Sequence, residues 1–217
     1  MKLIEQSVEF IYPRTLGDGV AELKRIEQAG RNCWRSEGKI SCNSYRPFIE
    51  NLIKRGHESP LEFGHAVIKI VTGRDVLAEI TRHRIASFAV QSQRYVDESR
   101  TGDIEFIKPL FFKDVSDNPD HAYDDRDYAA TMTWIDAMEN IEGAYKHLRD
   151  LGIKNEDARK VLPNSTATTI FMDVNLRELL HIYKLRSANS AYPEMRECMR
   201  LLKHEADKVL PGFLPDT

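Results

Sequence analysis

Residues 82–95, RHRIASFAVQSQRY, gather the side chains best suited to binding an anion. The stretch holds three arginines, one histidine, two serines and two glutamines without an acidic residue, although the whole chain has a formal net charge of −3. Arginine can contact a phosphate through two N–H groups at once, and hydroxyl and amide groups can bind the remaining oxygens. The stretch therefore predicts a phosphate site, whereas Arg82–Arg84 alone could simply end a helix, where cations favour the dipole.

Arg186 is a second candidate, near the end of the segment NLRELLHIYKLRS, residues 175–187. The helical spacing predicts four residues on the core face: Leu176, Leu179, Leu180 and Tyr183. Arg186 follows Tyr183 by three positions, so it lies beside this apolar stripe, and a half-buried guanidinium needs an acceptor. That acceptor could be one of the 34 acidic residues or a ligand, and the spacing leaves both alternatives open.

The segment GHESP, residues 56–60, places His57 and Ser59 at a predicted helix end, where a cap and turn are the simpler interpretation. The spacing of His57 and His65 matches no metal-ligand pattern, so we expect no metal site. The sequence contains no GxGxxG, GxxxxGK[ST] or GxSxG motif. Any nucleotide would therefore be held by arginines and hydroxyl groups rather than by a glycine-rich loop.

The composition indicates a globular protein, and 217 residues are most simply one domain, 1–217. A sequence pI near 6.2 argues against a general nucleic-acid binder. No apolar run approaches the roughly 20 residues of a membrane span, and the first residues lack the apolar core of a signal peptide. Three cysteines without CxxC spacing argue against a disulfide framework, so we expect a cytoplasmic protein.

Hydrophobic periodicity predicts mixed helices and strands without strict alternation, which is typical of an α+β fold. The predicted strands are 3–11, 61–73 and 165–174. The helices predicted with numbered bounds are 18–34, 74–84, 127–151, 175–187 and 193–211. Two further helices are predicted, one from near Pro47 to before Pro60 and one capped by Asn155 and ending at Pro163. Residues 109–127, rich in aspartate and proline, are expected to form a surface arm.

Four segments together resemble the flavin-dependent thymidylate synthases, the ThyX family. RHRIASFAVQSQRY resembles the family signature, with an RHR triplet, Ser87, and then Ser92 with Arg94. GHESPLEFGH, ARKVLPNSTATT and NLRELLHIYKLRS resemble three further family segments. They occur in the family order between about residues 56 and 187, and four such matches are more specific than one.

This resemblance implies a fold with a central antiparallel or mixed sheet flanked by helices. It implies FAD as cofactor, NADPH as reductant and methylenetetrahydrofolate as carbon donor in the reductive methylation of dUMP to dTMP. Family members are homotetramers whose active sites lie where subunits meet, so we expect a homotetramer with no nucleic-acid or membrane partner.

The resemblance also assigns site residues. For dUMP it implies Glu79, Arg82, Ser92, Gln93, Arg94, Arg159 and Arg186, with Arg186 catalytic because it would stabilise the ionised pyrimidine ring. For FAD it implies His57, Ser59, Arg82, His83, Arg84, Val90, Asn175, Arg177 and His181.

Three positions depart from the family pattern: Ala89 and Val90, where many members carry polar side chains, and Ser190, where many have histidine. Two alternatives therefore stay open. One is a related enzyme that methylates UMP or hydroxymethylates dUMP. The other is a non-enzymatic protein that binds nucleotides or nucleic acid.

Overall fold

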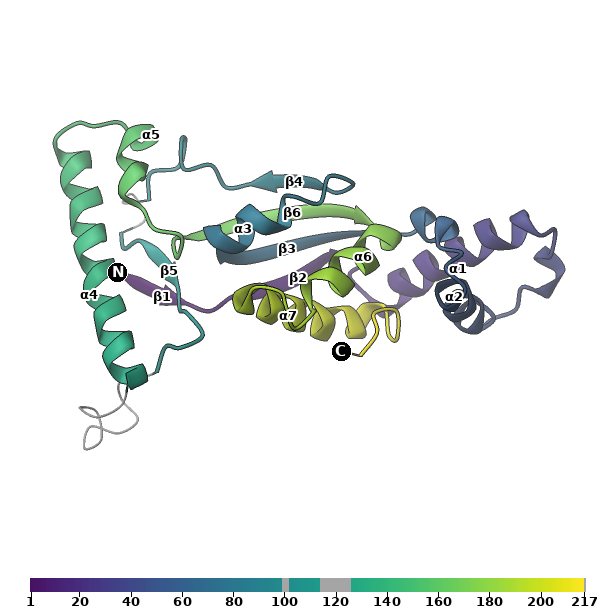
Figure 1. The fold of residues 1–217 in the computed structure, drawn as a ribbon. Coiled ribbons are helices and arrows are strands. Elements are labelled where there is room, and N and C mark those ends of the chain that lie inside the picture. The colour runs from purple at the N-terminus through teal and green to yellow at the C-terminus, as the bar shows by residue number, and fades with distance from the viewer. Residues whose placement is uncertain (99–101, 114–125, 217) are drawn as a thin grey trace. The chain divides into compact units, whose positions relative to one another are not determined.

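The computed structural model describes residues 1–98, 102–113 and 126–216 (Figure 1). The chain divides into two compact units, each assembled from separated stretches of sequence. Unit 1 comprises Met1–Gln6, Val71–Glu79 and Val90–Thr169, and unit 2 comprises Ser7–Ile70, Ile80–Ala89 and Ile170–Thr217. Most of the surface arm expected at 109–127 lies outside the described residues.

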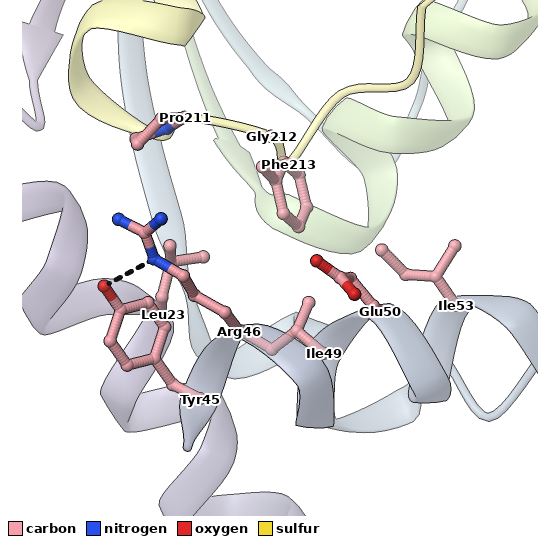
Figure 2. Close-up of a pocket in the computed structure, with 9 residues that line it drawn as sticks. All are labelled: Leu23, Tyr45, Arg46, Ile49, Glu50, Ile53, Pro211, Gly212 and Phe213. Atoms are coloured by element: carbon pink, nitrogen blue, oxygen red, sulfur yellow. Dashed lines mark hydrogen bonds between the residues drawn. The ribbon is translucent and has the colours of Figure 1, made fainter. Parts of the chain in front are cut away.

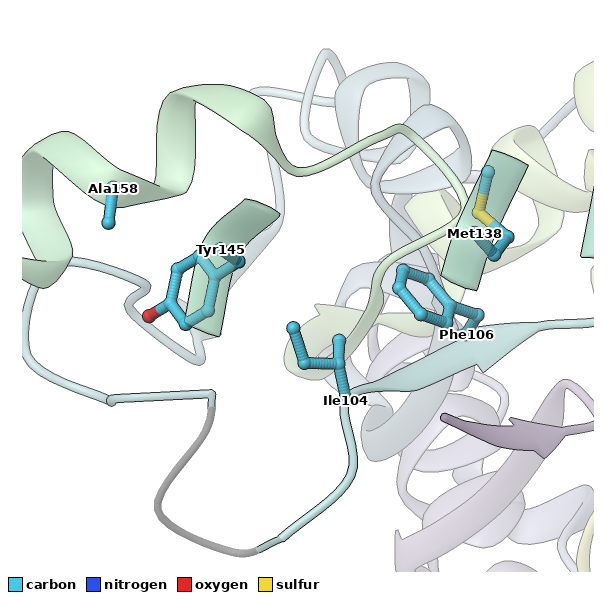
Figure 3. Packing of buried hydrophobic residues seen from close by; sticks show 5 residues of the cluster. All are labelled: Ile104, Phe106, Met138, Tyr145 and Ala158. Atoms are coloured by element: carbon cyan, nitrogen blue, oxygen red, sulfur yellow. The ribbon is translucent and has the colours of Figure 1, made fainter. Parts of the chain in front are cut away.

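Unit 1 is built around a short parallel pair of strands and a long helix. Strand β1 (Lys2–Ile4) pairs with β5 (Glu105–Ile107). The helical elements are α3 (Arg74–Ile80), α4 (Arg126–Asp150), α5 (Asn155–Ala158) and the 3₁₀ turn η4 (Arg159–Val161). Figure 3 shows Met138 and Tyr145 of α4 beside a cluster completed by Ile104, Phe106 and Ala158. This cluster is the core that fixes α5 against α4.

Unit 2 contains most of a four-stranded sheet and four of the longer helices. The strands are β2 (Ser7–Tyr12), β3 (His65–Gly73), β4 (Ser87–Val90) and β6 (Ala167–Asn175), in the order β2–β3–β6–β4. The helices are α1 (Leu16–Cys33), α2 (Tyr45–Lys54), α6 (Leu176–Arg186) and α7 (Pro193–Val209), with 3₁₀ turns η1 (Glu37–Lys39) and η2 (Ser59–Phe63). Helix α7 packs on β2, while α6 packs on α7 and η2.

Helix α6 confirms the predicted amphipathic pattern. Its four predicted core residues are at most 2% exposed: Leu176, Leu179, Leu180 and Tyr183. The helix begins directly after β6, and the Asn175 side chain accepts a hydrogen bond from the Glu178 backbone N–H at 2.9 Å. This N-cap satisfies one of the free donors of the first turn. The cap and the buried stripe together fix which residues α6 presents beside the core.

Several predicted elements are confirmed, including the α+β class with an antiparallel sheet, the long helix near 127–151 and both C-terminal helices. The single strand predicted at 3–11 is wrong, because β1 pairs with β5 whereas β2 belongs to the four-stranded sheet. The strand predicted at 61–73 begins only at His65, after η2.

Two helix predictions need correction. The helix predicted at 74–84 ends at Ile80, and Arg82–Arg84 lie in a turn, where the buried His83 ring is engaged by side chains of α6. Asn155 is the first residue of α5 rather than its cap, which is Lys154, and its side-chain amide donates to the Arg94 carbonyl oxygen at 2.9 Å. No helix in the described part of the chain is long and apolar enough to cross a membrane.

Candidate active site

In unit 1, two of the predicted nucleotide-binding residues, Arg94 and Arg159, contact Glu156. The Arg94 Nε donates to Glu156 Oε2 at 2.9 Å, and the Arg159 Nε donates to the Glu156 backbone carbonyl at 3.1 Å. Ser92 joins this group, since its Oγ accepts the Arg94 backbone N–H at 3.3 Å. The arrangement places two guanidiniums and a hydroxyl around one short helix, which suits an anion of more than one oxygen.

Unit 1 also holds five buried side-chain atoms that lack hydrogen-bond partners among the described residues: Arg74 Nη1, Gln93 Nε2, Glu98 Oε1, Thr166 Oγ1 and Thr168 Oγ1. Burial raises the pKa of the Glu98 carboxyl, against the attraction of the Arg74 guanidinium and the Gln93 amide. Burial lowers the pKa of Arg74. The Glu98 carboxylate acts in the opposite direction, whereas the Arg159 charge lowers this pKa further. Buried polar groups are normally paired, so these donors and this acceptor are suited to a ligand.

The sequence interpretation missed Arg74 and Glu98, because Arg74 is the first residue of α3, Glu98 lies in a turn, and neither belongs to a motif. Glu79 and Val90 are also in unit 1 and both are half-buried, Glu79 in α3 and Val90 at the end of β4.

In unit 2, three predicted flavin-binding residues line one pocket of about 330 Å³: Asn175, Arg177 and His181. Its other lining residues are Glu58, Glu62, Ile85 and Glu178. Arg177 Nη1 pairs with Glu62 Oε1 at 2.6 Å, so any anion bound by Arg177 must compete with that carboxylate. The pocket thus combines amide, imidazole and guanidinium donors with carboxylate acceptors, which suits a ligand rich in both kinds of group.

Next to this pocket, His83 and Arg186 are joined by a hydrogen bond. The Arg186 Nε donates to His83 Nε2 at 3.0 Å, and His83 Nδ1 lies 3.3 Å from Glu178 Oε1. The His83 and His181 rings meet edge to face with centroids 5.9 Å apart. Burial and then the Arg186 charge lower the pKa of His83, although Glu178 acts in the opposite direction. The half-buried Arg186 therefore donates from its Nε to the imidazole of His83. The sequence alone did not identify this acceptor.

The ligand atoms of His83, Glu178 and His181 all lie within 4.8 Å of one another, as in a metal site. Two features count against a resident cation there. Arg186 already occupies the His83 Nε2 lone pair, so the ring proton is on Nδ1, the nitrogen facing Glu178. The positively charged Arg186 guanidinium would also repel a metal ion bound by His83. The arrangement fits a hydrogen-bonded chain better than a metal centre.

The remaining predicted residues of unit 2 are at the surface. The Arg82 and Arg84 side chains are exposed and make no ion pair within the described residues. His57 is exposed and stacks on Trp34, with ring centroids 6.1 Å apart. Ser59 begins η2 and is exposed. These four residues are thus accessible to a ligand but are not gathered by direct contacts.

A different pocket of unit 2, about 280 Å³, contains none of the predicted residues (Figure 2). Figure 2 shows Arg46, Ile49, Glu50 and Ile53 of α2 facing the segment Pro211–Phe213. The Arg46 Nε donates to the Tyr45 hydroxyl at 3.1 Å. Its residues belong to no motif found in the sequence, so this pocket is not part of the candidate active site.

The fold is that of enzymes that methylate uracil nucleotides. The solved structure of the UMP/dUMP methylase PolB from Streptomyces cacaoi, bound with 5-Br dUMP, matches with a TM-score of 0.77 at 24% identity, covering 98% of this chain and 95% of that one. Thymidylate Synthase X from Helicobacter pylori, solved with FAD and dUMP, matches with a TM-score of 0.69 at 25% identity, covering 95% and 97%.

Sequence comparison is more specific. The family model described as thymidylate synthase complementing protein matches residues 18–212. The flavin-dependent thymidylate synthase of Geobacter sulfurreducens is 33% identical over 204 residues, covering 87% of this chain and 82% of that protein. A probable flavin-dependent thymidylate synthase of Mycobacterium phage L5 is 32% identical over 200 residues, covering 88% and 78%. The chain belongs to the flavin-dependent thymidylate synthase family. It is therefore an enzyme, and the non-enzymatic alternative is set aside.

Proposed function

We propose that this protein uses FAD to convert dUMP to dTMP, with NADPH as reductant and methylenetetrahydrofolate as carbon donor. The observation that carries the proposal is Arg186, a guanidinium hydrogen-bonded to His83 beside the pocket of Asn175, Arg177 and His181. A positive charge fixed next to a partly enclosed pocket can stabilise negative charge that develops on a pyrimidine ring.

The residues proposed to bind the nucleotide are Glu79, Arg82, Ser92, Gln93, Arg94, Arg159 and Arg186. The contacts of Arg94 and Arg159 with Glu156, with the Ser92 hydroxyl beside Arg94, support a phosphate role, because these donors can bind several oxygens at once. The unpaired Nε2 of Gln93 adds a buried donor in the same short segment.

The residues proposed for FAD fit it chemically but cover only part of it. They are His57, Ser59, Arg82, His83, Arg84, Asn175, Arg177 and His181, together with the backbone of Val90. A pocket of about 330 Å³ lies near the lower limit for small-molecule sites, roughly 300–1,000 Å³, so it would hold one portion of a dinucleotide. When bound, FAD supplies hydride transfer, and the protein contributes orientation and charge.

The proposed chemistry needs no covalent enzyme adduct. Arg186 would stabilise the ionised ring, and Ser92 would bind or position the nucleotide. A serine nucleophile needs an adjacent general base. The Ser92 Oγ accepts a hydrogen bond from the Arg94 backbone N–H, which is not a base.

We also propose a homotetramer with active sites shared between subunits. Large apolar side chains are exposed in unit 2 near the candidate residues, including Ile85 at 70%, Phe63 at 57% and Trp34 at 52% exposure. A second subunit covering them would also complete the partial FAD pocket. Light scattering should give a tetramer, whereas a fully active monomer would exclude a shared site.

Cytoplasmic location is part of the same proposal. The three cysteines are free thiols, with Cys33 and Cys42 exposed and Cys198 buried, as expected in a reducing compartment.

One alternative substrate has specific support. The fold matches PolB, whose solved structure is that of a UMP/dUMP methylase, and Ala89, Val90 and Ser190 depart from the family pattern. UMP methylation or dUMP hydroxymethylation by this chain therefore remains the second candidate.

The deciding experiment compares dUMP with UMP as substrates of the purified protein and identifies products by mass. We expect a yellow, flavin-containing sample, strong preference for dUMP, and a product heavier by one methyl group. Equal or faster turnover of UMP would favour the second candidate. A colourless protein that takes up no added FAD would contradict both.

A further inference from the structure

Glu178, His83 and Arg186 form one continuous chain of polar contacts inside unit 2. His83 Nδ1 lies 3.3 Å from Glu178 Oε1, and Arg186 Nε donates to His83 Nε2 at 3.0 Å. Glu178 is only 8% exposed and His83 6%, so water competes little for these contacts. The chain therefore links a carboxylate near the start of α6 to the guanidinium at its end through a residue from the Arg82–Arg84 turn.

The direction of each hydrogen bond follows from the groups involved. The Nε–H of arginine can only donate, so His83 Nε2 must offer a lone pair. The imidazole, whose pKa is lowered chiefly by burial, then carries its single proton on Nδ1. That proton points to the Glu178 carboxylate, which can only accept when ionised. Donation thus runs from Arg186 to His83 to Glu178.

Each member of the chain depends on the next. The carboxylate favours the Nδ1–H form of His83, and only this neutral form gives Arg186 an acceptor at Nε2. An Nε2–H imidazole would instead face the Arg186 N–H with a second N–H. We propose that Glu178 is a positioning residue that orients Arg186 by fixing the protonated nitrogen of His83. This inference rests on the proposed role of Arg186 toward the pyrimidine.

A purely structural role for Glu178 makes different predictions. The Glu178 backbone N–H is capped by Asn175, and a carboxylate in the first turn of a helix favours the dipole. Either effect would change the stability of α6 without changing the step that depends on Arg186. The two roles are therefore separable by kinetics and by spectroscopy.

The kinetic test is a double-mutant cycle of Glu178→Ala and Arg186→Ala, measured as kcat at saturating dUMP. We expect Glu178→Ala to lower kcat by roughly tenfold or more, and the double variant to match Arg186→Ala alone, as for residues that act as a unit. Glu178→Gln should recover part of the loss, because its amide oxygen can accept from Nδ1–H. Multiplicative losses in the double variant would overturn the proposal.

A matched control is Glu27→Gln in α1, another buried carboxylate of unit 2, which pairs with Arg31 at 3.0 Å. It should change thermal stability without lowering kcat. If it lowers kcat as much as Glu178→Ala does, the effect of Glu178 is general destabilisation and the proposal is wrong.

A second measurement does not depend on turnover. Nitrogen NMR of the histidine rings in the purified protein, with His83 assigned through His83→Gln, reports which ring nitrogen carries the proton. We expect the proton on Nδ1 in the wild type and a shift toward Nε2 in both Glu178→Ala and Arg186→Ala. A wild-type proton on Nε2, or no change in Glu178→Ala, would contradict the inference. If His83 behaves as expected but dUMP is not converted, the proposed function fails while the hydrogen-bonded chain stands.

Discussion

Arg94 Nε lies 2.9 Å from Glu156 Oε2, so a guanidinium proposed to bind the nucleotide phosphate has a protein carboxylate as a rival partner. The Arg94 side chain is 57% exposed, and ion pairs this open to water contribute little to folding. The same carboxylate would lie close to a phosphate bound by Arg94 and repel it. We therefore expect Glu156 to affect nucleotide affinity more than stability.

Replacing Glu156 by glutamine tests this relationship. We expect dUMP binding to tighten about two- to fivefold, which corresponds to the 0–1 kcal/mol of an exposed ion pair. The melting temperature should barely change. Calorimetric titration measures the affinity, and Asp157→Asn is the control, since Asp157 is adjacent but pairs with Lys160 at 3.1 Å. Weaker binding in Glu156→Gln would mean that the carboxylate holds Arg94 ready for the ligand.

Ser92→Ala separates a binding role from a nucleophilic one. Losing a hydrogen bond to a charged group costs about 1.5–3 kcal/mol, so dUMP binding should weaken by roughly ten- to a hundredfold. Turnover at saturating dUMP should stay measurable, whereas Arg186→Ala should lose most of its kcat. Steady-state kinetics distinguishes the two patterns. Abolished turnover with normal dUMP and FAD binding, or a nucleotide adduct on Ser92 found by peptide mass, would make Ser92 a catalytic nucleophile.

Helix α6 illustrates what could be predicted from the sequence. Its i, i+3, i+4, i+7 spacing predicted the buried face and a half-buried Arg186 in need of an acceptor, and both are confirmed. The identity of the acceptor could not be predicted, because His83 is 103 positions away and only the tertiary fold brings it to Arg186. Glu178 was missed for a related reason, since its position in the first turn suggests only a favourable helix start.

Secondary-structure predictions from local sequence patterns were wrong at two places, the start of α5 and residues 3–11. Asn155 has the residue type of an N-cap, yet α5 starts at Asn155 itself, and the Asn155 side-chain amide donates to the Arg94 carbonyl oxygen. Residues 3–11 were predicted as one strand, but the two parts of this stretch pair with different strands. Neither partner choice is encoded in a local pattern.

The core cluster of unit 1 should depend strongly on Phe106, which is fully buried. Phe106→Ala removes a packed ring and should lower the free energy of unfolding by about 3–5 kcal/mol. Urea unfolding followed by fluorescence and circular dichroism provides the measurement. Phe111→Ala is the control, because Phe111 is 44% exposed and its loss should cost far less. Equal effects of the two variants would mean that this cluster does not carry the stability of unit 1.

Cys198 makes a prediction about pH. Its thiol is fully buried in α7, and burial raises its pKa from 9.0 to about 12. The folded protein therefore keeps the proton at a pH where the unfolded chain releases it. Below pH 9 both states are protonated, so this thiol adds no pH dependence. Between pH 9 and 12 the unfolded chain binds fewer protons, so the free energy of unfolding falls by up to about 1.4 kcal/mol per pH unit.

The measurement compares the wild type with Cys198→Ala by denaturant unfolding under reducing conditions from pH 7 to 10.5. The variant should be less stable by a constant amount up to about pH 8.5, because it loses packed volume. Above that pH the difference should shrink, since only the wild type has the buried thiol. Cys33→Ala, which removes an exposed thiol, should follow the wild-type curve throughout. Parallel curves for the wild type and Cys198→Ala up to pH 10.5 would show that the Cys198 thiol ionises equally easily in the folded and unfolded states.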